Sequence, residues 1–214
     1  MELTMQGEPL QKWKKLCVFE DGFQYRQQYY SFEDIDSLEF QWISANVRVN
    51  FVPAGTDYEA HLKINLTGDR PAIKANHNGS ITKWPQASAK WKSQQIYCVY
   101  AELAERSYEH RMRKYLTCLS DYGYFIYDGT KFYPNGKVVS GEKEADINTH
   151  KLMKLDNNTL FIQVPGKNGF LNLLREILWA DPSVYVEINK DKDCFYTLMK
   201  RIYGVALADM QTIC

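Results

Sequence analysis

The chain has 214 residues, which is enough for one large domain or for two domains of about 100 residues each. Its content of 45% apolar and 24% charged residues is typical of a folded soluble protein and excludes a disordered or fibrous chain. Lys and Arg together number 26, as do Asp and Glu, so the net charge provides no general attraction to nucleic acid or to an anionic membrane. Any such binding must therefore be local.

Export or membrane insertion is not expected. Residues 1–15 lack the apolar core of a secretory signal, and no segment has the roughly 20 apolar residues of a membrane span. The five cysteines include no Cys-x-x-Cys pair and are interpreted as reduced thiols. We therefore expect a soluble, cytoplasmic protein.

A similar segment occurs twice and predicts an internal repeat. The first copy contains Phe19-Glu20-Asp21-Gly22-Phe23 and the second Tyr127-Asp128-Gly129, each an apolar strand followed by an Asp-Gly turn and an aromatic strand. Asp-Gly is expected to supply the positive φ of a tight hairpin turn in both. Each copy continues to an acidic residue followed by isoleucine, Asp34-Ile35 and Asp146-Ile147. We expect two units, residues 1–120 and 121–214.

In the first unit, the pattern predicts a hairpin of strands 17–19 and 23–29 and a third strand over 37–43. Alternating residues predict a second hairpin, 47–52 and 58–66, around a turn at 53–57. A short strand over 71–75 and a loop over 76–80 follow. Three- and four-residue spacing from Gln94 then predicts an amphipathic helix that ends at Asp121-Tyr122-Gly123. Tyr97, Ala101 and Ala104 are among the residues expected on its apolar face, which is widened at its start by Ile96, Val99, Tyr100 and Leu103.

The second unit is expected to follow the same plan with less sheet. After its opening hairpin come a short strand at Val138-Val139, a charged loop over 141–144 and a hairpin of strands 151–155 and 159–164. An additional amphipathic helix is predicted over 170–179, then a strand over 184–188. Asn189 is expected to cap a closing helix that contains Phe195 to Ile202 and ends at Gly204.

The two openings and the Phe32-Glu33-Asp34-Ile35 corner resemble bacterial pleckstrin-homology-like and GRAM-like domains. In those families an Asp-Gly turn joins the first two strands, and an acidic-Ile pair leads into the third. The resemblance implies an α+β fold of two tandem antiparallel sheet or barrel units, each closed by a C-terminal amphipathic helix. Such folds are mainly associated with binding lipid headgroups, peptides or partner domains. The helix predicted over 170–179 departs from this pattern.

The strongest local anomaly is the segment 70–101, which contains no acidic residue. Its cations beside amphipathic rings predict contact with a headgroup layer or with phosphates. The alternative is a solvated loop whose tryptophans dock onto the sheet or helix. Lys12-Trp13-Lys14-Lys15 is a smaller example of the same chemistry, or else a basic entry to the first strand. The candidate ligand-binding residues are Lys83, Trp84, Lys90, Trp91 and Lys92.

No catalytic or metal-binding signature occurs in the sequence. Scattered histidines and the absence of nucleophile, phosphate-loop and dinucleotide motifs predict no catalytic residue, metal or cofactor. We expect a non-enzymatic binding or scaffolding module that recognises a protein or peptide partner, with peripheral anionic-lipid contact as a further option and no nucleic acid. The alternative is a small enzyme whose site forms at the junction of the units, with His77 among its groups. Dimerisation through the helix at 170–179 is a third option.

Overall fold

The computed structural model describes residues 8–49, 52–79, 86–148, 153–156, 158–162 and 184–205. The chain divides into two compact units, one of residues 1–111 and 189–191 and the other of residues 112–188 and 192–214. Each unit is described by itself below. The helix predicted over 170–179 lies outside the described residues.

The first unit opens with a four-stranded antiparallel meander, β1 (Gln11–Trp13), β2 (Leu16–Val18), β3 (Gly22–Tyr25) and β4 (Gln28–Ser31). The hairpin of β2 and β3 was predicted, but the continuous strand over 23–29 is wrong because the chain turns at residues 26–27. β1 was not predicted, since its three residues carry too short a pattern to identify a strand. A capping box then turns the chain through the short helix η1 (Phe32–Asp34) into the next sheet.

The second sheet of this unit contains β5 (Ile35–Val49), β6 (Val52–Leu66) and β7 (Ile73–Gly79), in that order. The turn predicted over 53–57 is wrong. Those residues belong to β6, whose pairing with β5 absorbs Pro53 at a register shift near Arg48. The loop predicted over 76–80 is also wrong for residues 76–79, because alternate burial continues through His77 to Gly79 in β7.

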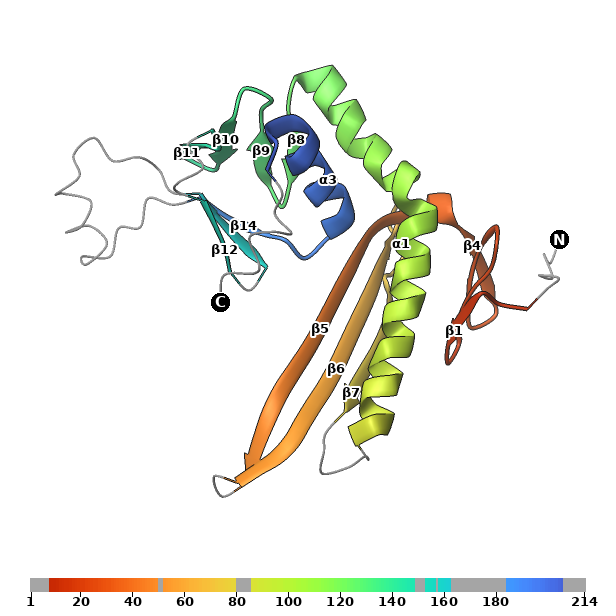
Figure 1. The fold of residues 1–214 in the computed structure, drawn as a ribbon. Coiled ribbons are helices and arrows are strands. Elements are labelled where there is room, and N and C mark those ends of the chain that lie inside the picture. The colour runs from red at the N-terminus through yellow and green to blue at the C-terminus, as the bar shows by residue number, and fades with distance from the viewer. Residues whose placement is uncertain are drawn as a thin grey trace. The chain divides into compact units, whose positions relative to one another are not determined.

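Helix α1 (Gln86–Tyr122) lies along this three-stranded sheet (Figure 1). It begins earlier than the predicted Gln94 and ends where predicted. Tyr97 and Ala101 are exposed, so their predicted place on the apolar face is wrong. The prediction is confirmed for Ile96, Val99, Leu103 and Ala104, which are buried. They share a core with sheet residues Leu38, Leu62, Ile64 and Ile73.

The second unit repeats the order of sheets. Its four-stranded meander contains β8 (Phe125–Tyr127), β9 (Thr130–Phe132), β10 (Lys137–Ser140) and β11 (Lys143–Asp146). The loop predicted over 141–144 is wrong for residues 143–144, which belong to β11, whereas residues 141–142 form a turn. A three-stranded sheet of β12 (Met153–Asp156), β13 (Thr159–Ile162) and β14 (Val184–Glu187) follows, and then α3 (Lys192–Tyr203).

The α+β class with antiparallel sheets is confirmed. Among the described residues, the sheets form no closed barrel. The helix ending at Gly204, which has φ +69°, is also confirmed. It begins at Lys192, however, so Asn189 is not the residue that precedes it.

The two Asp-Gly pairs perform different structural tasks. Asp128 and Gly129 have φ values of 48° and 71°, which confirms the predicted tight turn in the second unit. Gly22 has no positive φ and instead begins β3, so the same prediction for the first unit is wrong. A Cβ at Gly22 would overlap the Tyr29 hydroxyl and the Tyr30 carbonyl oxygen. Glycine is needed there because β3 and β4 approach closely.

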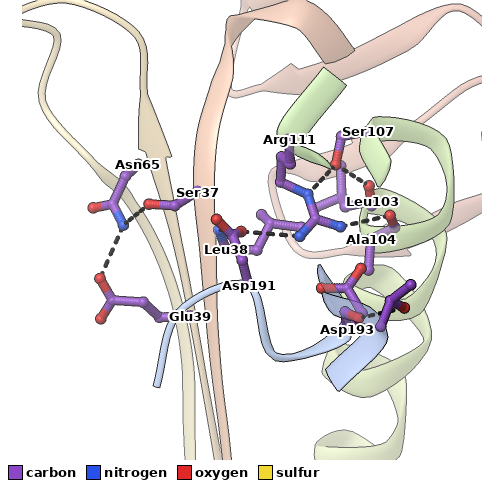
Figure 2. A network of polar contacts seen from close by, with 11 residues as sticks. Ser37, Leu38, Glu39, Asn65, Leu103, Ala104, Ser107, Arg111, Asp191 and Asp193 are labelled. Carbon is purple, nitrogen blue, oxygen red and sulfur yellow. Dashed lines mark hydrogen bonds and ion pairs between the residues drawn. The ribbon is translucent and has the colours of Figure 1, made fainter. Parts of the chain in front are cut away.

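A buried ion pair organises the core of the first unit (Figure 2). Arg111 Nη1 donates to Asp191 Oδ1 at 2.9 Å, and both side chains are fully buried. The remaining polar atoms of Arg111 are satisfied by its own helix, since Nε donates to Ser107 Oγ and Nη2 to the Ala104 carbonyl. The sequence pattern identified neither residue as part of the core. Both are structural residues.

The same aspartate is also bound to β5. Asp191 Oδ1 accepts a hydrogen bond from the Leu38 N–H at 2.9 Å, and the Asp191 N–H donates to the Leu38 carbonyl at 2.8 Å. Next to this pair, Glu39 and Lys190 form an isolated antiparallel bridge. Residues 189–191 therefore occupy part of the outer edge of β5.

Replacing Gly22 with Ala should reduce the free energy of unfolding by about 1–3 kcal/mol, because the backbone oxygen of Tyr30 cannot yield without weakening the pairing of β3 with β4. Urea denaturation measures this change. The comparison variant is Gly129→Asn, which keeps a residue tolerant of positive φ and meets no atom within 4 Å. It should be nearly neutral. Equal stability of the Gly22→Ala protein would contradict the close approach.

Replacing Asp191 with Asn should reduce the free energy of unfolding by about 3–5 kcal/mol, because the buried Arg111 charge loses its partner. Asn keeps an acceptor for the Leu38 N–H and tolerates the positive φ of 42° at this position. The double variant with Arg111→Met should regain most of the loss. A shared urea midpoint for Asp191→Asn and the parent protein would show that the pair contributes no stability.

Candidate functional site

Three cations of the first unit meet at one end of the four-stranded meander. Lys14 and Lys15 form the turn between β1 and β2, and Arg26 begins the turn between β3 and β4. Leu16 pairs with Tyr25, and the Arg26 N–H donates to the Lys15 carbonyl at 2.8 Å. In a meander, alternate turns lie at the same end of the sheet. This geometry brings residues that are distant in sequence together.

Two of these cations occupy turn positions that favour glycine. Lys14 has φ 52° and Arg26 has φ 60°. Positive φ is uncommon for residues other than Gly, Asn and Asp, and the left-handed conformation costs roughly 1–2 kcal/mol. Residues in such conformations cluster at functional sites. The two turns therefore carry long cationic side chains where backbone preference alone would place a small residue.

A pocket of about 200 Å³ lies between these turns and β7. It contacts three consecutive β7 residues, of which Lys74 and Asn76 are exposed whereas Ala75 is buried. Successive side chains of a strand point to opposite faces, so a cavity that contacts all three lies at the edge of the strand. The remaining lining residues are Trp13, Lys14, Lys15, Leu16, Tyr25 and Arg26. We call this the basic pocket.

The basic pocket has a marked charge imbalance. Four cations line it, namely Lys14, Lys15, Arg26 and Lys74, and no carboxylate does. In the described part of the chain, none of the four forms an ion pair. The Lys14 ammonium lies 5.1 Å from the Trp13 ring centroid, and the Arg26 guanidinium lies 5.3 Å from that of Tyr25. The aromatic rings thus support the cations without neutralising them.

His77 lies behind the basic pocket. Its ring packs edge-on against Trp13, with centroids 6.0 Å apart, and the residue is only 9% exposed. Its Nε2 is buried without a hydrogen-bond partner. Burial lowers the pKa of His77, as do the positive charges of Lys92 and Lys14, whereas Glu59 acts in the opposite direction. His77 is therefore held neutral beside a cluster of cations.

The candidate ligand-binding residues predicted from the acid-free segment do not line the basic pocket where the structure describes them. Lys83 and Trp84 lie outside the described residues. Lys90 and Trp91 are exposed on α1 and do not line the basic pocket, while the charge of Lys92 reaches His77. Trp91 is 54% exposed, so the alternative in which it docks onto the sheet or helix is wrong. The predicted set stays a prediction.

The smaller motif at Lys12 to Lys15 and the acid-free segment 70–101 each contribute three residues to the lining of the basic pocket. Trp13, Lys14 and Lys15 line it directly, and the contact of Trp13 with His77 joins this motif to the acid-free segment. Arg26 and Lys74 were not predicted as site residues. No Gly, Asn, Asp or Pro marks the turn at Arg26, and Lys74 was counted among the segment's cations but placed in an ordinary strand.

A second, larger pocket of about 300 Å³ lies on the polar face of the β5–β6–β7 sheet. Lys74 and Asn76 line both pockets. Here charges are already paired, since Glu39 accepts hydrogen bonds from Lys63 at 2.8 Å and Asn65 at 2.9 Å. Partial burial raises the pKa of Glu39, but these bonds and the charges of Lys63 and Lys190 outweigh it and lower the pKa. This pocket offers less unsatisfied charge than the basic pocket.

The described residues contain no group of three or more His, Cys, Asp or Glu side chains arranged to hold a metal ion. Within the same residues, no helix combines the length and the apolar character needed to cross a membrane. The chemistry that the basic pocket can perform is electrostatic binding of an anion, with aromatic and aliphatic carbon as its floor.

The depressed pKa of His77 makes stability depend on pH. The unfolded chain binds a proton at His77 more readily than the folded chain does. The contribution of His77 to the free energy of unfolding should therefore be fully present above about pH 6.5 and be lost as pH falls through the folded-state pKa. His77→Gln should reduce this dependence between pH 7.5 and 5, measured by urea denaturation. His61→Gln serves as the comparison and should retain it. A parent protein equally stable at both ends would contradict a neutral, buried His77.

Searches against protein-family models, curated proteins and solved structures found no match to this chain.

Proposed function

We propose that the protein is a non-enzymatic binding module whose basic pocket binds an anionic group, such as a phosphate or a cluster of carboxylates, on a larger ligand. The convergence of Lys14, Lys15, Arg26 and Lys74 on one pocket without a lining carboxylate carries this proposal. The whole chain is electrically balanced, with 26 residues of each sign, so this local excess is not a consequence of composition.

The size of the basic pocket supports binding of one group rather than of a whole small molecule. Its volume of about 200 Å³ is below the roughly 300–1,000 Å³ of typical small-molecule pockets. Its cations come from a strand and from two turns joined by a backbone hydrogen bond, so the backbone that carries them is in place before a ligand arrives. Such preorganisation reduces the entropy that binding must cost.

The repeated order of elements supports two tandem pleckstrin-homology-like units. Each unit has a four-stranded meander followed by a three-stranded sheet and then a helix. In each, an acidic residue and a buried isoleucine, Ile35 or Ile147, follow the meander. The described strands form no closed barrel, so the proposed relationship rests on the order of strands and helix. A cytoplasmic setting remains part of the proposal, since the cysteines and the sequence composition are those expected there.

An anion-binding module should lose affinity when the pocket loses its charge. The triple variant Lys14→Asn, Arg26→Asn and Lys74→Gln removes three cations and leaves residues that tolerate positive φ in both turns. We expect at least about tenfold weaker binding of inorganic tripolyphosphate by isothermal titration calorimetry, because nearby unit charges each contribute on the order of 1 kcal/mol. Binding by the parent protein should also weaken as salt is raised.

The matched control removes three cations that do not line the basic pocket: Lys137→Gln, Lys200→Gln and Arg201→Gln. It has the same net charge as the triple variant and should bind as the parent protein does. Equal loss in both would reveal a nonspecific charge effect. The proposal fails if the parent does not bind, or if the pocket variant binds as tightly as the parent.

A further inference from the structure

The three-stranded sheet of the first unit leaves one edge open beside the basic pocket. Within the described residues, β7 pairs with β6 alone, and no other strand pairs with its outer edge. The opposite edge of the sheet differs, because residues 189–191 bind Leu38 and Glu39 on β5. Unpaired N–H and C=O groups along an edge strand can pair with an added chain.

The position of the basic pocket links this edge to a charged ligand. Lys74, Ala75 and Asn76 all line the pocket, so a group bound there lies alongside the β7 backbone. The apolar part of the lining, from Trp13, Leu16 and Tyr25, suits the carbon stem of a side chain, and the four cations suit its anionic end. A ligand that extends from the pocket along β7 would have the shape of a peptide strand.

An added peptide strand combines both observations. In strand addition, main-chain hydrogen bonds supply affinity and pockets for alternate side chains supply specificity. Asn76 and Asn78 are exposed along the same face of β7 as Lys74, at the two-residue spacing of a strand. The second pocket continues from Lys74 and Asn76 across that face. A peptide beside β7 would therefore meet polar surface beyond its anionic side chain.

A membrane surface fits the basic pocket less well than a peptide does. Interfacial binding relies on aromatic side chains that project into the headgroup layer. Trp13 is buried and Tyr25 is half-buried, so the aromatic rings at the basic pocket do not project. Trp91 projects from α1, but it does not line the pocket.

We propose that β7 accepts an extended acidic peptide as an additional antiparallel or parallel strand, with one phosphorylated or carboxylate side chain seated in the basic pocket. This inference rests on the proposed anion-binding function and names the class of partner. Main-chain pairing with the peptide would satisfy the outer edge of β7, and the bound anionic side chain would neutralise the cations of the basic pocket. Neither feature alone points to a peptide, but their adjacency favours one.

Fluorescence anisotropy with synthetic peptides tests the inference. The probe is a labelled nine-residue peptide of alternating threonine and valine with a central phosphotyrosine. Two further versions carry backbone N-methyl groups on alternate residues, one for each parity, which removes the N–H groups on one side of the strand. We expect the parent peptide to bind at least tenfold more tightly than phosphotyrosine alone and than one N-methylated version.

Protein variants and hydrogen exchange locate the site. Lys74→Gln should weaken binding of the phosphopeptide severalfold, whereas Lys200→Gln, which removes an exposed cation of α3 outside the pocket, should leave it unchanged. Amide exchange of Ile73–Gly79 should slow when the peptide is bound. Unchanged exchange in β7, or equal affinity of both N-methylated versions and the parent peptide, would overturn strand addition.

The outcomes separate this inference from the proposed function. If tripolyphosphate binds in a pocket-dependent way but the phosphopeptide binds no better than phosphotyrosine, the basic pocket stands and the peptide strand is wrong. If the unphosphorylated peptide binds equally well, the edge is used and the anion site is wrong. Stronger binding to vesicles of phosphatidylserine than to the phosphopeptide would overturn the inference in favour of a membrane ligand.

Discussion

The first unit depends on the buried contact between Arg111 and Asp191. Two desolvated charges are tolerated in a core only when they are paired and hydrogen-bonded, and here α1 and β5 both supply hydrogen-bond partners to the pair. Asp191 comes from near the end of the chain, so a fragment that stops at residue 120 would contain the arginine without its partner. The core of the first unit is thus completed by a short segment far away in sequence.

The same contact holds residues 190–191 on one edge of the three-stranded sheet. With Asp191 bound to Leu38 and Lys190 paired with Glu39, β5 is partly covered on its outer side. β7 is the other end of that sheet, and the basic pocket lies beside it. The two edges of this three-stranded sheet therefore differ, since residues 189–191 cover part of the β5 edge and no described strand pairs with the outer edge of β7. The site follows from that asymmetry as much as from its cations.

The spacing of apolar residues predicted much of the fold, because the spacing typical of a helix or of an alternating strand can be recognised within a short segment of sequence. The hairpin at Asp128-Gly129, the end of α1 and the closing helix were predicted on such grounds and are confirmed. The failures came where tertiary structure decides. The turn at Arg26 has no turn-forming residue, Pro53 is accommodated inside β6, and Gly22 serves packing rather than turn geometry. Ser107 and Arg111 continue the spacing of the buried face of α1, which was the available signal for a buried arginine.

The candidate site was less accessible from sequence than the fold, since its residues are scattered over two turns and a strand. Lys14 and Arg26 have left-handed backbone conformations, which glycine and asparagine adopt more readily than lysine and arginine do. Mutational drift toward either small residue would therefore leave folding intact while erasing the charge. A relative of this protein that carries glycine at both turns would be expected to have the same architecture and a different ligand. The residues at these two positions would therefore show whether a relative keeps the ligand as well as the fold.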